Sequence, residues 1–264
     1  MQGNTRMGDM DMKIVIIGGT GLIGRRLVSI LQARGNEVVA ASPSMGVDAL
    51  TGAGLAQALH GAAVAVDVSN APSFEDAVSL AFFRGTTANL LEAARDAGVR
   101  HLVALSVVGT DRLQASGYFR AKLAQEQLIG GGNVPYTIVR ATQFFEFLST
   151  IADGYTVDDA VLLPDIALQP VAAADVSALL AEIAADAPAN GIVELAGPER
   201  GPLAGFAAGW LGARDDRRRI IVTAERDYFG APADDRTLIP GEDARIAPTR
   251  LDVWLAAQSQ EQGA

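Results

Sequence analysis

The sequence has no cysteine and only two histidines, His60 and His101, among its 264 residues. Without cysteine the chain can form no disulfide, no thiolate nucleophile and no cysteine-ligated metal centre. Neither histidine has a second ligand at a metal-binding spacing, so we expect no metal site. These absences exclude disulfide-stabilised scaffolds and cysteine-based chemistry.

Positive charge is also scarce. Lysine and arginine number 21 against 31 acidic residues, which gives a net charge of −10. Binding to nucleic acid requires a basic face, so we expect no nucleic-acid partner. The one dense basic run, residues 217–219, follows Asp215 and Asp216 and is more typical of a solvated turn than of a phosphate site.

No apolar run reaches the length that a membrane span requires, so we expect no membrane partner. With 49% hydrophobic residues the chain can nevertheless bury a substantial core. Residues 1–11 are polar, do not have the pattern of a signal peptide, and are expected to form a disordered leader. We therefore expect a cytoplasmic protein whose oligomeric state stays open, a homodimer included.

Predicted strands and helices alternate along the chain, which is typical of an α/β fold with a doubly wound parallel sheet. The predicted strands of the first part are 13–17, 37–41, 46–48, 62–68, 101–106 and 136–140. A helix after the first strand ends near residue 35, and others cover 54–60, 74–97 and 116–129. After Arg140 we expect a helix start at 144–148, extended pieces at 160–163, 166–168, 192–195 and 220–223, and helices at 176–185, 203–211 and 251–257. Asp175 is expected to cap the first of these last three helices.

A glycine-rich turn follows the first strand and precedes the first helix. Two registers fit, Gly18-x-x-Gly21-x-x-Gly24 and Gly19-x-Gly21-x-x-Gly24. In either register glycine allows a tight turn and a close approach of the backbone to a pyrophosphate. The helix N-terminus would direct N–H groups at that anion. Strand, glycine turn and helix in this order indicate a dinucleotide-binding site.

The residues after the second strand bear on the choice of dinucleotide. An aspartate or glutamate there favours NAD, because it binds the ribose 2′-hydroxyl. Here the chain has Ser42 and Ser44 instead, and Arg25 could add positive charge near a 2′-phosphate. The pattern favours NADP, with NAD as the alternative cofactor, unless Ser42–Ser44 is only a turn.

Three further residues are candidates for cofactor contacts. Asp48 is predicted to bind the adenine edge, unless it is a plain loop carboxylate. Ser69 and Asn70 follow a strand at its carboxyl end, where ligands bind in open α/β sheets.

Tyr118, Lys122 and Ser106 form a candidate catalytic group. Tyr118 and Lys122 are four residues apart on a predicted helix and so share one face. A neighbouring ammonium lowers the pKa of a phenol, which lets tyrosine exchange a proton with a carbonyl or alcohol oxygen. Ser106, at the end of a strand, would orient the substrate oxygen. The alternative is an ordinary amphipathic helix.

With these motifs the chain resembles the short-chain dehydrogenase/reductase superfamily, in its atypical NmrA-like branch. The matching stretches are GGTGLIG at 18–24, GTTANLLEAARDAGV at 85–99, HLVALSVVG at 101–109, YFRAK at 118–122, PYTIVRATQFFEF at 135–147 and QPVAAADV at 169–176.

The resemblance implies a Rossmann domain over 12–150 and a small C-terminal α+β substrate region, or lid, over 151–264. It implies dinucleotide contacts from residues of the glycine turn and the catalytic helix: Gly18, Thr20, Gly21, Leu22, Ile23 and Lys122. Gly24 and Arg25 complete the turn. It also places Thr142, Gln143 and Phe144 near the nicotinamide.

These features predict an oxidoreductase that transfers a hydride between NADP(H) and a small apolar carbonyl or quinone-like substrate. Aromatic residues of the C-terminal part would line the substrate pocket together with Gln143, unless they are core residues: Phe144, Phe145, Phe147 and Tyr155. One alternative is a non-catalytic NADP(H) sensor that acts through a protein partner. Others are a nucleotide-sugar epimerase, which would need more basic residues than the cluster at 214–219, and a purely structural dinucleotide-binding protein.

Overall fold

A computed structural model describes residues 12–262 of the protein, and the predicted leader over residues 1–11 lies outside the described part. The first half of the chain contains β1 (Lys13–Ile17), α1 (Leu22–Ala33), β2 (Glu37–Ala41), η1 (Pro43–Met45), α2 (Leu55–Leu59), β3 (Val64–Asp67), α3 (Asp76–Asp96), β4 (His101–Val107), α4 (Gly117–Gly130) and β5 (Tyr136–Ala141). Apart from η1, these elements follow the predicted alternation of apolar strands and helices, and a glycine stands at or within two residues of the end of each helix.

The second half is less regular. It contains η2 (Phe145–Phe147), α5 (Leu148–Gly154), β6 (Thr156–Val157), β7 (Ala160–Pro164), β8 (Ala167–Leu168), α6 (Ala173–Ile183), β9 (Gly191–Ala196), β10 (Gly201–Pro202), α7 (Leu203–Gly212), β11 (Arg219–Thr223), β12 (Asp227–Tyr228), β13 (Ala231–Pro232), β14 (Arg245–Ile246) and α8 (Leu251–Gln262). Most of the additional strands are two residues long, too short for a periodic sequence signal.

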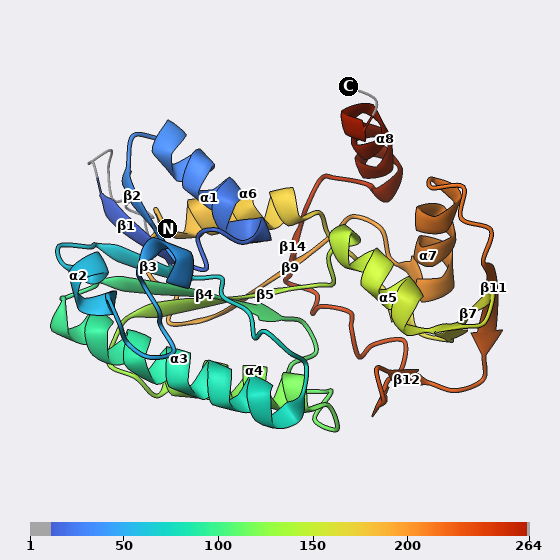
Figure 1. The fold of residues 1–264 in the computed structure, drawn as a ribbon, viewed down its shortest axis with the longest axis horizontal. Helices are drawn as coiled ribbons and strands as arrows, with labels where there is room; N and C mark the ends of the chain where they lie inside the picture. Colours follow the sequence, from blue (N-terminus) through green and yellow to red (C-terminus); the bar gives the residue numbers. More distant parts are fainter. Residues whose placement is uncertain (1–11, 263–264) are drawn as a thin grey trace. The chain divides into compact units, whose positions relative to one another are not determined.

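A central sheet of seven strands has the order β14-β9-β5-β4-β3-β1-β2. The pairings β1–β2, β1–β3, β3–β4 and β9–β14 are parallel. Figure 1 shows α1 and α6 on one face of the sheet and α3 and α4 on the other. The predicted α/β, doubly wound fold is therefore confirmed. Its strand order reverses between β1 and β3, which is the switch point where ligands bind in such sheets.

The chain divides into two compact units that interleave along the sequence. Unit 1 comprises residues 12–106, 117–140 and 176–193 of the described part, and unit 2 comprises 107–116, 141–175 and 194–262. The sequence predicted one boundary, after residue 150, whereas these units alternate along the chain. The two-domain division at residue 150 stays a prediction.

The core of unit 1 lies between the sheet and the α2–α3–α4 side. It contains apolar side chains from β1, β3, β4 and β5 packed on Leu55, Leu59, Leu90, Ala94 and Ile129 of the helices. On the other side α1 buries Ile23, Leu27 and Leu31. Two buried layers fix the sheet, so the loops at its carboxyl edge have a rigid base.

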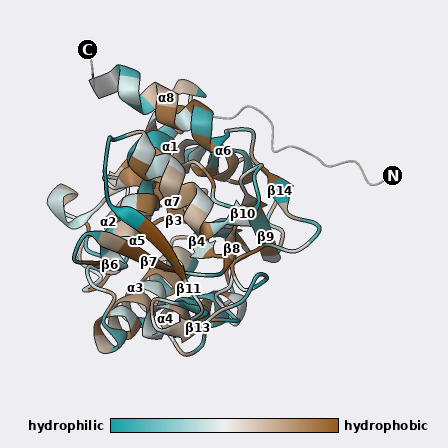
Figure 2. Ribbon diagram, turned by 90° about the vertical axis from the view of Figure 1, so that its right-hand side faces the viewer, coloured by the Kyte–Doolittle hydropathy of each residue, from teal (hydrophilic) through white to brown (hydrophobic). Residues whose placement is uncertain are grey.

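Unit 2 contains three small sheets with the orders β11-β7-β6, β10-β8 and β12-β13. Figure 2 shows β11 as a largely hydrophobic strand, and Ile221 and Val222 on it are 43% and 53% exposed. Within residues 12–262, no helix is both long and apolar enough to cross a membrane.

Two local predictions were wrong. The strand expected at 46–48 does not form: η1 ends at Gly46 in the left-handed region (φ +82°), and Asp48 makes only an isolated bridge with Ala53. Asp175 does not cap its helix, because α6 begins earlier, at Ala173. Its carboxylate instead accepts hydrogen bonds from the backbone N–H and the hydroxyl of Thr249.

His101 makes the stability of the fold sensitive to acid. Burial lowers the pKa of this side chain from 6.5 to about 4. The unfolded chain then binds the proton more readily between these two values, so the unfolding free energy falls as the pH is lowered from about 6.5 to about 4. His101→Gln, which can still reach Thr137, should reduce this slope in denaturant titrations across that range. The exposed His60→Gln is the matched control, and equal slopes in all three proteins would contradict the prediction.

Candidate active site

The glycine turn after β1 is packed too tightly for other residues. Gly18 has φ +80°, and a Cβ on it would lie 2.9 Å from the backbone nitrogen of Ser69. A Cβ on Gly19 would lie 2.7 Å from the Cα of Ala40, and one on Gly24 would overlap the carbonyl oxygen of Gly18. Gly21 is less crowded. Gly18, Gly19 and Gly24 are therefore the positions that require glycine. Gly18 belongs to one predicted register, Gly19 to the other and Gly24 to both, so the packing does not choose between the registers.

The start of α1 can receive an anion. Its N-cap is Gly21, no side chain caps it, and its first turn has no acidic residue. Thr20, Leu22 and Arg25 are exposed around it, whereas Ile23 is buried and anchors the helix. An uncapped N-terminus combines N–H donors with the positive end of the helix dipole. Such an end fits a pyrophosphate.

The loop after β2 has no carboxylate before Asp48. Ser42 is buried, and its hydroxyl lies 3.0 Å from the hydroxyl of Ser44. The Asp48 Oδ1 accepts hydrogen bonds from the backbone N–H groups of Leu50 and Thr51 at 2.9 and 3.4 Å. One oxygen of Asp48 therefore stabilises its own turn, which favours the interpretation of Asp48 as a loop carboxylate.

The loop after β3 lies between the glycine turn and α4. Asp67 Oδ1 accepts hydrogen bonds from the backbone N–H of Ser69 at 3.0 Å and from its hydroxyl at 2.6 Å. The next residue, Asn70, accepts a hydrogen bond from the Tyr118 hydroxyl at 3.0 Å. Ser69 and Asn70 thus lie at the switch point, beside Gly18 and Tyr118 respectively.

Tyr118 sits in the first turn of α4 among aromatic rings. Its ring centroid lies 5.1 Å from that of Phe74, 5.9 Å from that of Phe83 and 5.7 Å from that of Phe119. Burial raises the pKa of its phenol well above 10. The expected lowering by a lysine is therefore not seen in this state of the protein, and Tyr118 is protonated at neutral pH.

Lys122, one turn further along α4, is deeply buried. Its ammonium donates hydrogen bonds to the carbonyl of Leu105 at 2.8 Å and to the Oε1 of Gln125, and it lies 4.4 Å from the centre of the Phe83 ring. Burial lowers its pKa from 10.5 to about 8, while the charges of Asp67 and Glu126 act in the opposite direction.

Ser106 lies on β4 and contacts α4 two turns beyond Tyr118. Its hydroxyl donates to the Oε1 of Glu126 at 2.5 Å. Glu126 also forms a bidentate ion pair with Arg140, with contacts of 3.0 and 2.6 Å. Eight residues separate Glu126 from Tyr118, which corresponds to about 12 Å along an α-helix. The structure therefore places Tyr118 and Lys122 one turn apart on α4, with hydrogen bonds to different partners, and it does not bring Ser106 to Tyr118.

Four residues of this region were missed by sequence reasoning: Asp67, Gln125, Glu126 and Arg140. A partial signal existed, because positions 118, 122 and 126 lie on one face of a helix and position 126 is acidic. Asp67 ends an otherwise apolar strand. The pairing across elements could not be seen without the fold.

The residues predicted after β5 belong to unit 2. Thr142 is buried, and its hydroxyl donates to the carbonyl of Gln169 at 2.7 Å. Gln143 is only 6% exposed, and neither its Oε1 nor its Nε2 has a hydrogen-bond partner among the described residues. A buried amide without partners costs free energy, so such groups are often found where a ligand binds.

The predicted aromatic residues differ in exposure. Phe145 is fully buried and packs on Trp254, with ring centroids 5.6 Å apart, which favours its interpretation as a core residue. Phe144 is half-buried. Tyr155 is half-buried beside Phe229, and its hydroxyl accepts a hydrogen bond from the backbone N–H of Phe229 at 2.7 Å. Burial raises the pKa of Tyr155 to about 12.

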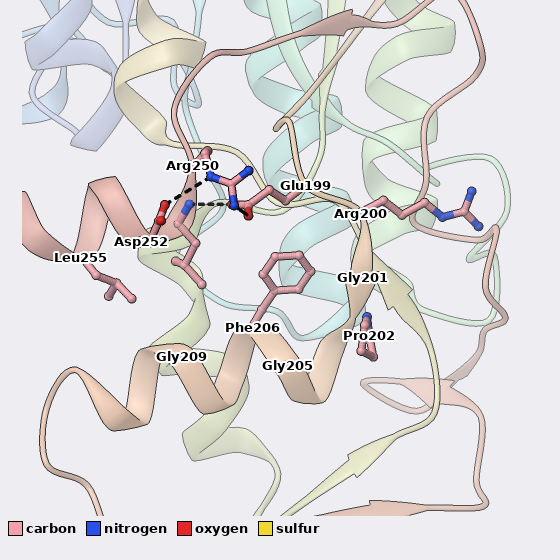
Figure 3. Close-up of a pocket in the computed structure, with 11 residues that line it drawn as sticks. Glu199, Arg200, Gly201, Pro202, Gly205, Phe206, Gly209, Arg250, Asp252 and Leu255 are labelled. Carbon is pink, nitrogen blue, oxygen red and sulfur yellow. Dashed lines mark hydrogen bonds and ion pairs between the residues drawn. The ribbon is translucent and has the colours of Figure 1, made fainter.

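Unit 2 also contains a pocket of about 380 Å³ between α7, α8 and the segment that leads into β10 (Figure 3). Arg250 is one of the residues that line the pocket, and its guanidinium forms ion pairs with Glu199 at 2.6 Å and with Asp252 at 3.4 Å. Phe206 and Leu255 supply apolar surface. None of the predicted site residues lines this pocket.

The fold and the glycine turn define a dinucleotide-binding α/β protein. The residues present fit the cofactor, because the tightly packed glycine turn leads into an N-terminus of α1 that no side chain caps and that has no acidic residue in its first turn. A protein-family model described as NAD(P)H-binding matches residues 18–187. The chain belongs to this NAD(P)H-binding family.

Solved structures support the same fold over nearly the whole chain. A dTDP-4-dehydrorhamnose reductase from Bacillus anthracis, in complex with NADP, is 14% identical, with a TM-score of 0.74 over 94% of this chain and 99% of that one. A short-chain dehydrogenase/reductase superfamily protein from Agrobacterium tumefaciens with bound NAD is 19% identical, with a TM-score of 0.68 over 95% and 98%. A UDP-glucose 4-epimerase from Thermus thermophilus with NAD is 19% identical, with a TM-score of 0.63 over 94% and 93%.

No curated protein sequence matches the chain significantly. The resemblance to short-chain dehydrogenases/reductases is confirmed at the level of the NAD(P)-binding fold and its structural neighbours, and the NmrA-like branch stays a prediction.

Gly24→Ala tests the cradle. The added methyl group would overlap the Gly18 carbonyl, so we expect a loss of stability of about 1–3 kcal/mol and a loss of NAD(P)H binding. Gly212→Ala at the end of α7 is the control, because a Cβ there meets nothing within 4 Å. Thermal unfolding and fluorescence titration with NADPH measure both effects. Unchanged binding by Gly24→Ala would show that α1 does not need this close contact.

Gln143→Met tests the unpaired amide. Replacing a buried, unpartnered polar group by an apolar one of similar shape should raise the unfolding free energy by about 1–3 kcal/mol. Gln169→Met is the control from the same unit, because Gln169 donates to the carbonyl of Gly197 at 2.9 Å and its loss should destabilise the protein. Denaturant unfolding without ligand compares them, and destabilisation by both substitutions would contradict the prediction.

Proposed function

We propose that the protein is an NADP-preferring oxidoreductase that transfers a hydride between NADP(H) and a small apolar carbonyl or quinone-like substrate. The observation that carries this proposal is Tyr118: a protonated phenol in the first turn of α4, next to the loop after β3, with Lys122 one turn behind it. A phenol at the carboxyl edge of a dinucleotide-binding sheet is suited to general acid catalysis.

In this proposal NADPH supplies the hydride, and the chain supplies the proton and the geometry. Tyr118 donates its proton to the substrate oxygen, which suits the reductive direction because burial keeps the phenol protonated. Asn70 releases the Tyr118 hydroxyl when the substrate oxygen takes its place. Lys122 stabilises the phenolate that remains, through its positive charge. Ser106 takes no part unless its bond to Glu126 breaks.

The preference for NADP rests on the loop after β2. No carboxylate stands there to repel a 2′-phosphate, and the hydroxyls of Ser42 and Ser44 can donate to it. Arg25 is exposed on the first turn of α1 and can pair with the same group.

Within unit 2, the proposed substrate contacts are Gln143 and two half-buried aromatic residues. The unpaired amide of Gln143 can donate to a carbonyl oxygen or accept from a hydroxyl. Phe144 and Tyr155 offer ring surface, whereas Phe145 belongs to the core. In this proposal residues 12–150 carry most of the cofactor site and residues 151–264 supply the substrate region.

A second candidate is a sensor that binds NADP(H) without turnover. It is favoured by the bonds of the proposed catalytic groups: Tyr118 to Asn70, and Lys122 to Leu105 and Gln125. An enzyme must rearrange the first of these bonds to act on a substrate. A nucleotide-sugar enzyme, as among the structural neighbours, is less favoured because Arg218, Arg226 and Arg250 of unit 2 are paired with carboxylates.

The test begins with titration of the purified protein with NADPH and with NADH. Oxidation of the bound cofactor is then followed by absorbance against a panel of quinones, aldehydes and ketones. Tighter binding of NADPH together with turnover supports the proposal. Tight binding without turnover across the panel supports the sensor, and no binding of either dinucleotide contradicts both.

Tyr118→Phe should abolish turnover, with a loss of about 10²–10⁴-fold in kcat because the proton donor is gone. The affinity for NADPH should stay within a few-fold, since the ring and its aromatic neighbours remain. Tyr136→Phe, at the start of β5, is a control with a half-buried tyrosine of the same unit. Survival of activity in Tyr118→Phe would mean that another group donates the proton.

A further inference from the structure

Unit 1 contains a buried group of four charged residues behind the proposed active site. Asp67, Lys122, Glu126 and Arg140 are each no more than 8% exposed. Their formal charges cancel, with two acids and two bases. Charges are costly to bury unless they are paired and hydrogen-bonded, so an arrangement of this kind holds each member in one place.

Asp67 and Lys122 are joined through Gln125. The Gln125 Nε2 donates to Asp67 Oδ2 at 3.0 Å, and its Oε1 accepts a hydrogen bond from the Lys122 ammonium. A carboxylate can only accept and an ammonium can only donate, so the amide between them has a single orientation. The other oxygen of Asp67 accepts both hydrogen bonds from Ser69.

We propose that Asp67 is a positioning residue that keeps Lys122 cationic through Gln125 and at the same time fixes the loop at Ser69 against the glycine turn. Asp67 itself touches neither cofactor nor substrate in this role. The proposal rests on the proposed function for the use that Tyr118 makes of the Lys122 charge.

The surroundings of Lys122 show why it needs such a partner. Leu105 of β4 offers a carbonyl and Phe83 of α3 a ring face, and neither carries a charge. Two carboxylates face the ammonium, Asp67 from β3 and Glu126 from α4 itself. Glu126 is already shared between Arg140 of β5 and Ser106 of β4. Of these two carboxylates, Glu126 is already paired with the Arg140 cation, so Asp67 is the one whose charge is balanced by Lys122.

The second half of the proposal concerns the cofactor turn. The Gly18 backbone passes so close to Ser69 that a Cβ on Gly18 would lie 2.9 Å from the Ser69 nitrogen. Asp67 holds this nitrogen and the Ser69 hydroxyl through one oxygen. The shape of the glycine turn and the charge of Lys122 thus depend on the same carboxylate.

The test measures the unfolding free energy of the complete protein, without cofactor, between about pH 7 and pH 10. The folded-state pKa of Lys122, about 8, lies below its usual value of 10.5, so the unfolding free energy should rise with pH between these values. Asp67→Asn removes the charge but keeps an acceptor for Ser69. The rise should then begin at a pH lower by about one unit or more. In Lys122→Met the part of the rise in unfolding free energy that comes from titration of Lys122 should be absent.

Two variants make the result specific. Asp76→Asn removes an equal charge from the first turn of α3, where the carboxylate is 64% exposed and pairs with Arg120, and the pH of onset should stay at the wild-type value. The double variant Asp67→Asn/Gln125→Glu moves the charge next to Lys122 and should restore the onset. A merely structural role of Asp67 predicts no such rescue.

An onset in Asp67→Asn equal to that of wild type and Asp76→Asn would overturn the proposal. Should Asp67→Asn fail to fold, Gln125→Met decides, because it removes the amide that joins Asp67 to Lys122. Its onset should move to lower pH, and an unchanged onset overturns the proposal. These outcomes do not depend on turnover. If wild type is active, the alkaline limb of its kcat/KM profile should move to lower pH in Asp67→Asn; if it binds NADPH without turnover, the proposed function fails while the unfolding data still decide the role of Asp67.

Discussion

The close contact between α1 and the glycine turn is the constraint on which the rest of the site depends. Gly24 lies directly over the carbonyl of Gly18, and Gly19 passes beside Ala40 of β2. This contact places the uncapped start of α1 at the end of β1, beside the switch point of the sheet. Any larger side chain would move the helix away from the strand. The position of the uncapped start of α1 and its distance from the loop after β3 would change together.

A second constraint is the balance of charge under α4. The helix turns one face toward the sheet, and along that face follow Tyr118, Lys122 and Glu126. An apolar helix face would be easier to bury. In α4 polar side chains occupy buried positions where leucine or isoleucine is usual, so its buried and exposed faces differ little in hydrophobicity. Two charged residues of the sheet compensate the charges of the helix: Asp67 of β3 faces Lys122, and Arg140 of β5 pairs with Glu126. Under the proposed function, catalysis and packing would place opposing demands on the same helix face, as is common at active sites.

Unit 2 stabilises itself differently. Its sheets are short, and much of its order comes from aromatic contacts and from turns held by side chains. The hairpin of β12 and β13 holds Phe229 at φ +49°, a strained conformation for a bulky residue, with the Tyr155 hydroxyl bound to its N–H. The rings of Phe147 and Tyr155 pack on Phe229, which is 43% exposed. Strain of this kind persists only where the neighbouring contacts compensate it.

Sequence patterns alone were enough to predict the class of fold and the glycine turn, and to place Tyr118 and Lys122 on one helix face. Each of these depends on local periodicity, on glycine stereochemistry or on a spacing within one helix. Tertiary structure decided the rest. Ser106 was assigned to the proton transfer because it ends a strand, but the register of β4 against α4 gives its hydroxyl to Glu126, two turns away from Tyr118. The same packing of distant segments linked Asp67 to Lys122 through Gln125 and buried Phe145. It also buried the side chain of Gln143 with no hydrogen-bond partner among residues 12–262. Such pairings bring together residues tens of positions apart, and no local pattern in the chain encodes them.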